Sequence, residues 1–200
     1  MFSSIALAGG KALRLGRNKL REEVGGKTLL SRVLDTLRSL EGDIIIVTGA
    51  KQPLPPGSTG PRVTVVTDVF PDGGPLGGIY TGLAASDSFH NLVVACDMPF
   101  LNLPLLKYML KNSDGFDVVI PRLNGFIEPL HAVYSRNCLP YIEREIESGR
   151  RNIRSFFPVV KVRYIESEEI DRFDPEGLSF FNINTEDDLK KARELAKRIK

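Results

Sequence analysis

The sequence predicts an α/β fold in which helices cover both faces of a mostly parallel sheet. Two observations support this prediction. Short apolar runs rich in β-branched residues alternate with segments of helical periodicity, which is typical of parallel strands joined by helices. The first apolar run, residues 5–8, also stops at Gly9 and Gly10, and a helical pattern begins near Thr28. A strand, a glycine turn and a helix in this order present backbone N–H groups at the carboxyl end of the strand.

The remaining elements follow from the same alternation. We expect strands at residues 2–8, 43–48, 62–67, 91–96, 117–121 and 159–165, and helices at 28–40, 76–86, 103–110, 138–147 and 186–199. We expect a hairpin or lid at 122–128, turning through Asn124 and Gly125. The run 129–134 should be an antiparallel strand. Residues 180–185 should form a short strand that ends in a helix cap at Thr185.

Composition narrows the class of protein. The 200 residues suit a single domain, residues 1–200, and the apolar fraction of 42% is ordinary for a globular protein. A net charge of +2 gives no reason to expect nucleic acid or a membrane as partner, and no segment approaches about 18 consecutive apolar residues. Without such a segment, and without the apolar stretch of a signal peptide, we expect a cytoplasmic protein. Cys96 and Cys138 lack metal-type spacing, so we expect two reduced thiols.

The loop after the first strand is strongly basic. Its glycine spacing fits neither the dinucleotide fingerprint nor the Walker loop, which would need a glycine at Arg21. Against Glu22 and Glu23 stand six cations: Lys11, Arg14, Arg17, Lys19, Arg21 and Lys27. Because clustered cations repel one another, this composition favours an anionic ligand.

A single acid, Asp97, directly follows the apolar run 91–96. The carboxyl ends of strands are where α/β sheets bind ligands. Asp97 lies too early to cap the helix at 103–110, for which Asn102 is better placed. Since Mg²⁺ takes one or two carboxylates plus phosphate oxygens, we expect Asp97 to be a metal ligand.

Residues 7–19 read Leu-Ala-Gly-Gly-x-x-x-Arg-x-Gly-x-x-Lys. This pattern resembles the start of the nucleotidyltransferases and is most similar to the molybdenum cofactor guanylyltransferases. The similarity continues in residues 74–79, in the Asp-x-Pro of residues 97–99 and in the Asn-x-Asn-Thr of residues 182–185. There are two departures. Asn18 stands where the family usually has Asp, and Thr48-Gly49 stand where it often has an Asn that contacts the nucleotide.

The resemblance implies a single three-layer α/β/α domain with a Rossmann-like sheet of the nucleotide-diphospho-sugar transferase type. The N-terminal half would bind the nucleotide and the C-terminal half the acceptor. The implied reaction transfers GMP from GTP to the terminal phosphate of molybdopterin, with Mg²⁺, and releases pyrophosphate. Lys19, Asp97 and Arg14 would be catalytic, and Asp97 would hold the metal. The nucleotide-binding residues would be Leu7, Ala8, Gly9, Gly10, Lys19, Asp68, Gly74, Pro75, Leu76, Gly77, Asp97, Asn182 and Asn184.

Several interpretations stay open. The chain could be a cytidylyltransferase of the same cofactor, or a guanylyltransferase acting on a cobinamide or a phosphosugar. It could also be a non-catalytic subunit that carries nucleotide or cofactor, and molybdoenzyme maturation proteins are candidate partners. The basic residues Arg150, Arg151 and Arg154 would either meet the acceptor or lie in solvent. His131 could be a general base, but a phosphate nucleophile is already ionised, which favours an ordinary half-buried histidine.

Overall fold

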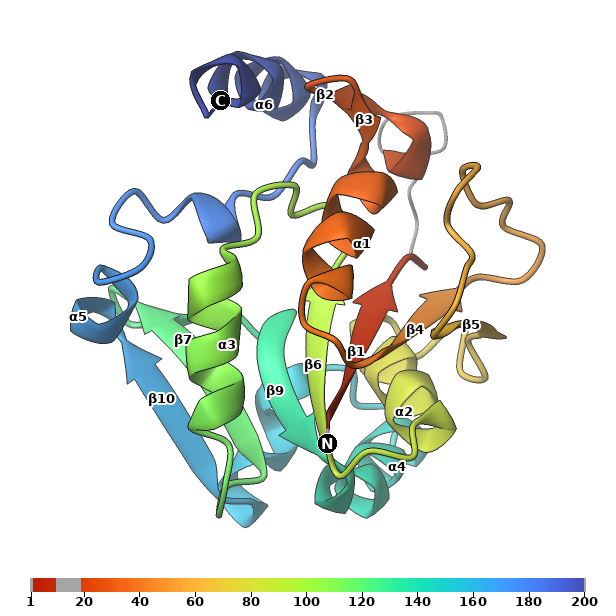
Figure 1. Cartoon of the computed structure of the whole chain (residues 1–200). Helices are drawn as coiled ribbons and strands as arrows, with labels where there is room; N and C mark the ends of the chain where they lie inside the picture. Colours follow the sequence, from red (N-terminus) through yellow and green to blue (C-terminus); the bar gives the residue numbers. More distant parts are fainter. Residues whose placement is uncertain (1, 10–18, 200) are drawn as a thin grey trace.

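The computed structural model describes residues 2–9 and 19–199 of the chain (Figure 1). Its strands are β1 (Phe2–Leu7), β2 (Glu23–Val24), β3 (Lys27–Thr28), β4 (Asp43–Thr48), β5 (Val63–Thr67), β6 (His90–Ala95), β7 (Val118–Leu123), β8 (Phe126–Ile127), β9 (His131–Ser135) and β10 (Val162–Glu166). Its α-helices are α1 (Leu29–Arg38), α2 (Pro75–Ala85), α3 (Leu103–Lys111), α4 (Leu139–Glu147), α5 (Ser167–Ile170) and α6 (Glu186–Arg198). Its 3₁₀ turns are η2 (Lys19–Arg21), η3 (Arg136–Cys138), η4 (Ile153–Val159) and η5 (Leu178–Phe180).

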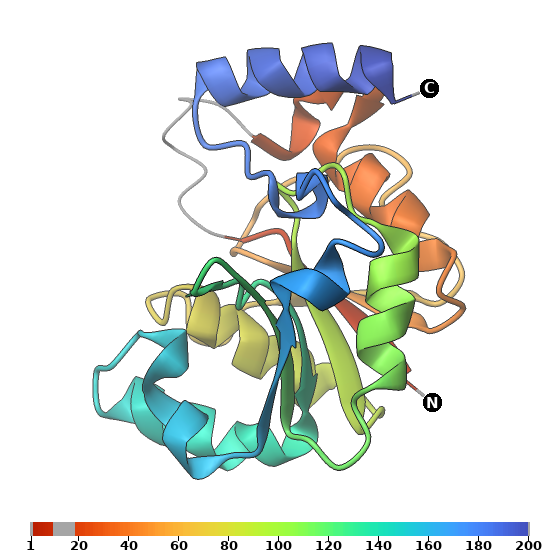
Figure 2. The same ribbon diagram turned by 90° about the vertical axis from the view of Figure 1, so that its left-hand side faces the viewer.

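The main sheet has the strand order β10-β7-β9-β6-β1-β4-β5, with β8 paired to β7. Strand β9 runs antiparallel to both of its neighbours, as expected, whereas β6, β1, β4 and β5 are parallel to one another. The apolar faces of α1 and α3 pack on one side of the sheet, and those of α2 and α4 pack on the other. Figure 2 shows these three layers from the side, which confirms the predicted α/β/α architecture.

Strand β4 shows why the sequence forms a doubly covered sheet. Ile44 and Ile46 pack into the core under α1 and α3, and Ile45 and Val47 pack into the core under α2. Because successive strand residues face opposite sides, an unbroken apolar run is needed where both faces are buried.

Helix α2 approaches β1 unusually closely. A Cβ at Gly82 would overlap the side chain of Ile5, and one at Gly78 would lie 3.2 Å from a methyl carbon of Leu7. The two glycines are four residues apart and therefore share one face of the helix. This face brings the start of α2 next to the end of β1, where the candidate site lies.

The expected strand at residues 180–185 is wrong. The chain there forms η5 and then an extended stretch that pairs with no strand among the described residues. In this stretch the Ile183 N–H donates a hydrogen bond to the Asp97 carbonyl at 3.0 Å. The alternating Asn-Ile-Asn pattern reflects one buried residue, Ile183, between two polar ones rather than a paired strand. The cap at Thr185 is confirmed, since its hydroxyl accepts the Asp188 N–H at 3.1 Å.

A third apolar cluster lies above the sheet. It joins residues of the β2–β3 hairpin, of α1, of the segment after β6, of the extended stretch before α6 and of α6 itself: Val24, Leu29, Phe100, Ile183, Leu189 and Ala192. Figure 1 shows α6 beside β2 and β3 at this end of the molecule. The cluster therefore brings together the chain segments that carry Lys19, Asp97 and Asn184. Among the described helices, none is both long and apolar enough to cross a membrane.

Candidate active site

A cavity of about 430 Å³ opens at the carboxyl ends of β1 and β6, against the start of α2. Many of the predicted site residues line it: Leu7, Ala8, Gly9, Lys19, Asp68, Gly74, Pro75, Asp97 and Asn184. Three predicted residues, Leu76, Gly77 and Asn182, do not line it. The other two, Gly10 and Arg14, lie outside the described residues.

Lys19 and Asp97 meet at the wall of this cavity. Lys19 Nζ lies 2.9 Å from Asp97 Oδ2, and the two side chains are 14% and 28% exposed. Lys19 Nζ also lies 3.4 Å from Asn184 Oδ1. The other carboxylate oxygen, Asp97 Oδ1, is buried without a hydrogen-bond partner among the described residues. A buried carboxylate oxygen without a donor favours a cationic ligand at this position.

The segment 182–184 turns its two amides to different places. The Ile183 N–H donates to the Asp97 carbonyl and so docks this segment against the end of β6. Asn184 then faces Lys19, whereas the Asn182 amide donates to the Phe180 carbonyl at 3.2 Å. Asn184 therefore belongs to the cavity, and Asn182 supports the turn beside it.

Asp68 lies at the α2 side of the cavity with a fixed orientation. Its Oδ1 accepts the Phe70 N–H at 2.9 Å and lies 2.9 Å from the Thr81 hydroxyl. Neither contact uses Oδ2. The carboxylate is thus oriented by its own loop and by α2, with one oxygen left to accept hydrogen bonds from a ligand.

The glycine-rich segment before α2 combines structural and binding roles. Gly74 has φ 61° and ψ −150°, which an L side chain rarely adopts, and it lines the cavity with Pro75 and Gly78. Gly77 instead allows close packing, because an added Cβ would lie 2.5 Å from the Phe70 carbonyl. Leu76 is completely buried in the core.

Gln52 is a residue that sequence reasoning missed. Its side-chain amide donates to the Ala8 carbonyl at 2.8 Å, and its Oε1 accepts the Gly49 N–H at 3.4 Å. It thereby fixes the turn that leaves β1. Thr48, which stands where the family often has an Asn, is 5% exposed and does not line the cavity. No local pattern marks Gln52, because it lies in a proline-rich loop distant from Ala8 in sequence.

Further cavity residues were also missed. They are apolar or small neighbours of the predicted ones, together with the residue that precedes β9: Leu20, Val47, Pro71, Gly78, Ala95, Cys96 and Leu130. Most follow from strand ends sharing one edge of the sheet. Leu130 comes close because its carbonyl accepts the Ala95 N–H at 2.9 Å.

We expected His131 to be half-buried, but the side chain is fully buried. Its ring packs 4.8 Å from the ring of Phe180, and neither nitrogen has a hydrogen-bond partner among the described residues. Burial lowers the pKa of this imidazole to about 3. Of the two interpretations of His131, general base and ordinary structural histidine, a buried and neutral ring favours the structural one.

The basic cluster at residues 150–154 is partly neutralised. Arg150 makes a two-pronged contact with Glu145, at 2.7 and 2.8 Å. Arg150 is therefore engaged within its own surface region. Neither it nor Arg151 or Arg154 lines the cavity.

Comparison with known proteins identifies the family. A model of the MobA-like NTP transferase domain matches residues 4–163. The chain belongs to this family. Members are nucleotidyltransferases, and the MobA-like domain covers the whole cavity except Asn184.

Relatives of this MobA-like chain are similar over nearly their full length. A protein of Pelotomaculum thermopropionicum named "Probable molybdenum cofactor guanylyltransferase" is 37% identical over 196 residues, covering 97% of this chain and 93% of that protein. The molybdenum cofactor guanylyltransferase of Desulfosudis oleivorans is 38% identical, covering 95% and 93%.

Solved structures agree with the family assignment. Molybdopterin-guanine dinucleotide biosynthesis protein A of Archaeoglobus fulgidus has a TM-score of 0.84 and 30% identity, covering 98% of this chain and 99% of that one. The 4-diphosphocytidyl-2C-methyl-D-erythritol synthase of Anaerococcus prevotii has a TM-score of 0.73 at 18% identity, covering 99% of this chain and 96% of that one, and so shares the fold.

Proposed function

We propose that this protein transfers GMP from GTP to the terminal phosphate of molybdopterin and releases pyrophosphate. The observation that carries the proposal is the pairing of Lys19 with Asp97 in a cavity that the oriented carboxylate of Asp68 also lines. Lys19 offers a cation for phosphates, and Asp68 offers an acceptor for a base. The names of the relatives at 37% and 38% identity support the same reaction.

The chemistry needs charge neutralisation and alignment more than a nucleophilic side chain. An oxygen of the acceptor phosphate attacks the α-phosphorus of GTP, a new P–O bond forms, and the bond to the β-phosphate breaks. Pyrophosphate leaves with the electron pair. Lys19 would offset negative charge on the nucleotide phosphates, next to the turn at Gly9. Two polyanions repel each other, so positioned cations lower the barrier.

Mg²⁺ fits the residues around Asp97. The described residues contain no cluster of three or more His, Cys, Asp or Glu side chains that could hold a metal by themselves. Mg²⁺ does not need such a cluster, because it binds through one or two carboxylates plus substrate phosphates. The buried, unpartnered Oδ1 of Asp97 suits this mode. When bound there, the ion would withdraw charge from phosphate oxygens.

Asp68 supports guanine as the base. Guanine presents a ring N–H beside an exocyclic amine, and the free Oδ2 of Asp68 together with backbone carbonyls of the cavity would accept from both. Cytosine lacks the ring N–H, so a carboxylate in that position would be left partly unpaired. The same carboxylate gives a cytidylyltransferase less support. We also propose that Gly10 and Arg14 contribute as the resemblance implies.

The nucleotide and the acceptor would bind to different parts of the sheet edge. Cavity residues from β1, β4 and the start of α2 would hold the nucleotide, and residues beyond Asp97 would meet the acceptor, within one domain of residues 1–200. GTP and molybdopterin would be the substrates. Docking to molybdoenzyme maturation proteins and a cytoplasmic location are parts of the same proposal.

Pyrophosphate release tests the proposal. The purified chain is incubated with Mg²⁺, molybdopterin and either GTP or CTP, and pyrophosphate is measured. We expect release with GTP, and its loss in Asp97→Ala with the fold intact by circular dichroism. The matched control is Asp114→Ala, an exposed acid remote from the cavity. GTP binding without turnover would instead identify a carrier, and wild-type rates in Asp97→Ala would refute the role of Asp97.

A further inference from the structure

The segment 97–100 runs between two cavities. Asp97 lines the main cavity, whereas Pro99 and Phe100 line a second one of about 420 Å³ on the side of α1 and the β2–β3 hairpin. A chain segment that borders free space on two sides has room to shift. Its position is then set by particular contacts as well as by the packing of Met98 and Phe100, which are buried.

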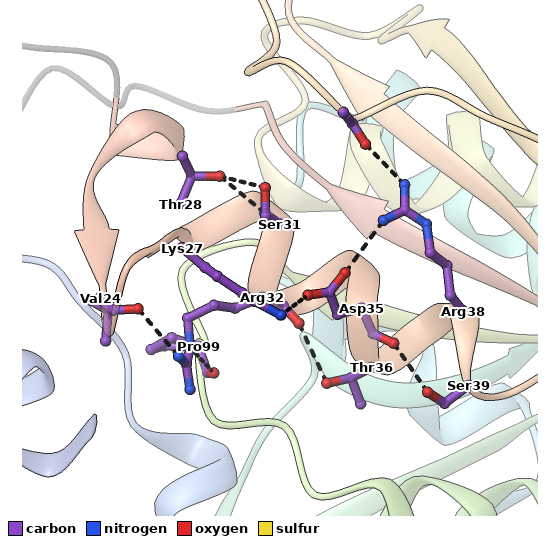
Figure 3. A network of polar contacts seen from close by, with 11 residues as sticks. Val24, Lys27, Thr28, Ser31, Arg32, Asp35, Thr36, Arg38, Ser39 and Pro99 are labelled. Carbon is purple, nitrogen blue, oxygen red and sulfur yellow. Dashed lines mark hydrogen bonds and ion pairs between the residues drawn. The ribbon is translucent and has the colours of Figure 1, made fainter. Parts of the chain in front are cut away.

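Arg32 supplies such contacts from the middle of α1. Its Nε–H donates to the Pro99 carbonyl at 3.0 Å, and its Nη1 donates to the Val24 carbonyl at 3.2 Å. Its guanidinium carbon lies 5.3 Å from the centroid of the Phe100 ring. Figure 3 shows the Arg32 side chain reaching between Val24 and Pro99. One side chain thus ties together three separate segments.

The surroundings are shaped for this guanidinium. Gly25 has φ 61°, and a Cβ at this position would lie 3.2 Å from Arg32 Nη1. Desolvation lowers the pKa of Arg32, and the nearby charge of Asp35 opposes this. The side chain is therefore partly withdrawn from water in exchange for two backbone carbonyls. A planar fork of donors can hold two carbonyls at a fixed separation, which a lysine cannot do.

We propose that Arg32 is a positioning residue that sets the meeting of Lys19 with Asp97. Val24 follows Lys19 by five residues through η2, and Pro99 follows Asp97 by two. By holding both carbonyls, Arg32 fixes the β2–β3 hairpin, which directly follows the turn η2 that carries Lys19, relative to the segment that carries Asp97. The Ile183 N–H fixes the Asp97 carbonyl from a third direction. Arg32 touches neither Lys19 nor Asp97, so its effect on the site is indirect.

A structure of Arg32→Met tests the geometry directly. Methionine keeps the length of the side chain and removes the donors. We expect the distance between Lys19 Nζ and Asp97 Oδ2 to grow from 2.9 Å to more than about 3.5 Å, beyond hydrogen-bond range. Arg38→Met is the matched control on the same helix, because Arg38 contacts Asp35 and the Gly57 carbonyl instead. An unchanged distance in Arg32→Met would overturn the proposal.

Kinetics give a second readout, which rests on the proposed transfer reaction. We expect Arg32→Met to lower kcat about tenfold or more with little change in the KM for GTP, because alignment rather than binding is lost. Arg32→Lys should recover part of the rate, and Arg38→Met should be normal. If the wild-type protein releases no pyrophosphate, the proposed function fails while the structural comparison still decides the role of Arg32. If Arg32→Met does not fold, the same distance is measured in Arg32→Lys.

Discussion

Lys19 Nζ donates a hydrogen bond to Asp97 Oδ2 at 2.9 Å, although the two residues are 78 positions apart in sequence. The pair joins the basic loop after β1 to the carboxyl end of β6, which are neighbouring strands. Under the proposed function, Lys19 faces the substrate phosphates and Asp97 the metal ion from adjacent positions at the cavity wall.

Removing the Lys19 charge tests this pair. We expect Lys19→Met to lower kcat by about 100-fold, the usual effect of losing one donor to developing charge. Steady-state pyrophosphate release measures it. The control is Lys190→Met, since Lys190 forms an exposed pair with Asp187 on α6. A Lys19→Met enzyme within twofold of wild type would exclude Lys19 from phosphate chemistry.

Asp68 is expected to determine the choice of base. Asp68→Asn replaces one acceptor oxygen with a donor and should reduce the preference for GTP over CTP by about tenfold or more, because one hydrogen bond to the base is lost. Competition between the two nucleotides in thermal-shift titrations measures the preference. Asp72→Asn, in the same loop but outside the cavity lining, is the control. Unchanged selectivity would place the base elsewhere.

His131 should make the protein sensitive to acid. Its pKa is about 3 in the folded state and near 6.5 when exposed, so between these values the unfolded chain binds a proton that the folded protein does not. The free energy of unfolding should therefore fall as pH drops from 6.5 toward 3. His131→Leu should flatten this dependence and stabilise the protein by about 1 kcal/mol at pH 7, since two unpaired nitrogens are removed. Urea unfolding across this pH range measures both effects.

The same variant separates structure from catalysis. His131→Leu should keep the wild-type rate of pyrophosphate release, because the ring is fully buried and does not line the cavity. A large loss of rate without loss of stability would revive the general-base interpretation.

The pair of Glu145 and Arg150 should also make the protein less stable in acid, over a lower pH range than His131. Hydrogen bonds from Arg150, and then from Ser155, lower the pKa of Glu145 from 4.5 to about 2. Its contribution is therefore present above pH 4.5 and lost as pH falls toward 2. Glu145→Gln should lower Tm at pH 7 and have little effect near pH 2, whereas Glu147→Gln, on the exposed face of α4, should be neutral. Equal Tm values for both variants at pH 7 would contradict this.

Much of the fold was predictable because its signals are local. Each buried parallel strand is an apolar run, as in β4, and the turn at Asn124 and Gly125 has the positive φ values of 49° and 83° that a tight hairpin needs. The segment at residues 180–185 misled because alternating polarity there serves one buried isoleucine. The conformation of this segment depends on a hydrogen bond to the Asp97 carbonyl, and Asp97 is far away in sequence.

The site divides along the same line. Lys19, Asp68, Asp97 and Asn184 each follow a strand or precede a helix, where sequence patterns place ligand-binding residues, and all four reach the cavity. Gln52 and Arg32 were not predictable, because their roles depend on backbone carbonyls contributed by distant segments. Leu76 and Gly77 belong to a genuine motif, but within it they serve packing rather than contact with the cavity.

Gly78 and Gly82, the two glycines on the face of α2 that packs on β1, set the distance between this helix and the strand. A Cβ at Gly82 would clash with Ile5, so an alanine there would push α2 away from β1 and also displace Gly74 and Pro75 at the start of the helix. The shape of the cavity beside Gly74 and Pro75 thus depends on two glycines, of which Gly82 lies outside its lining.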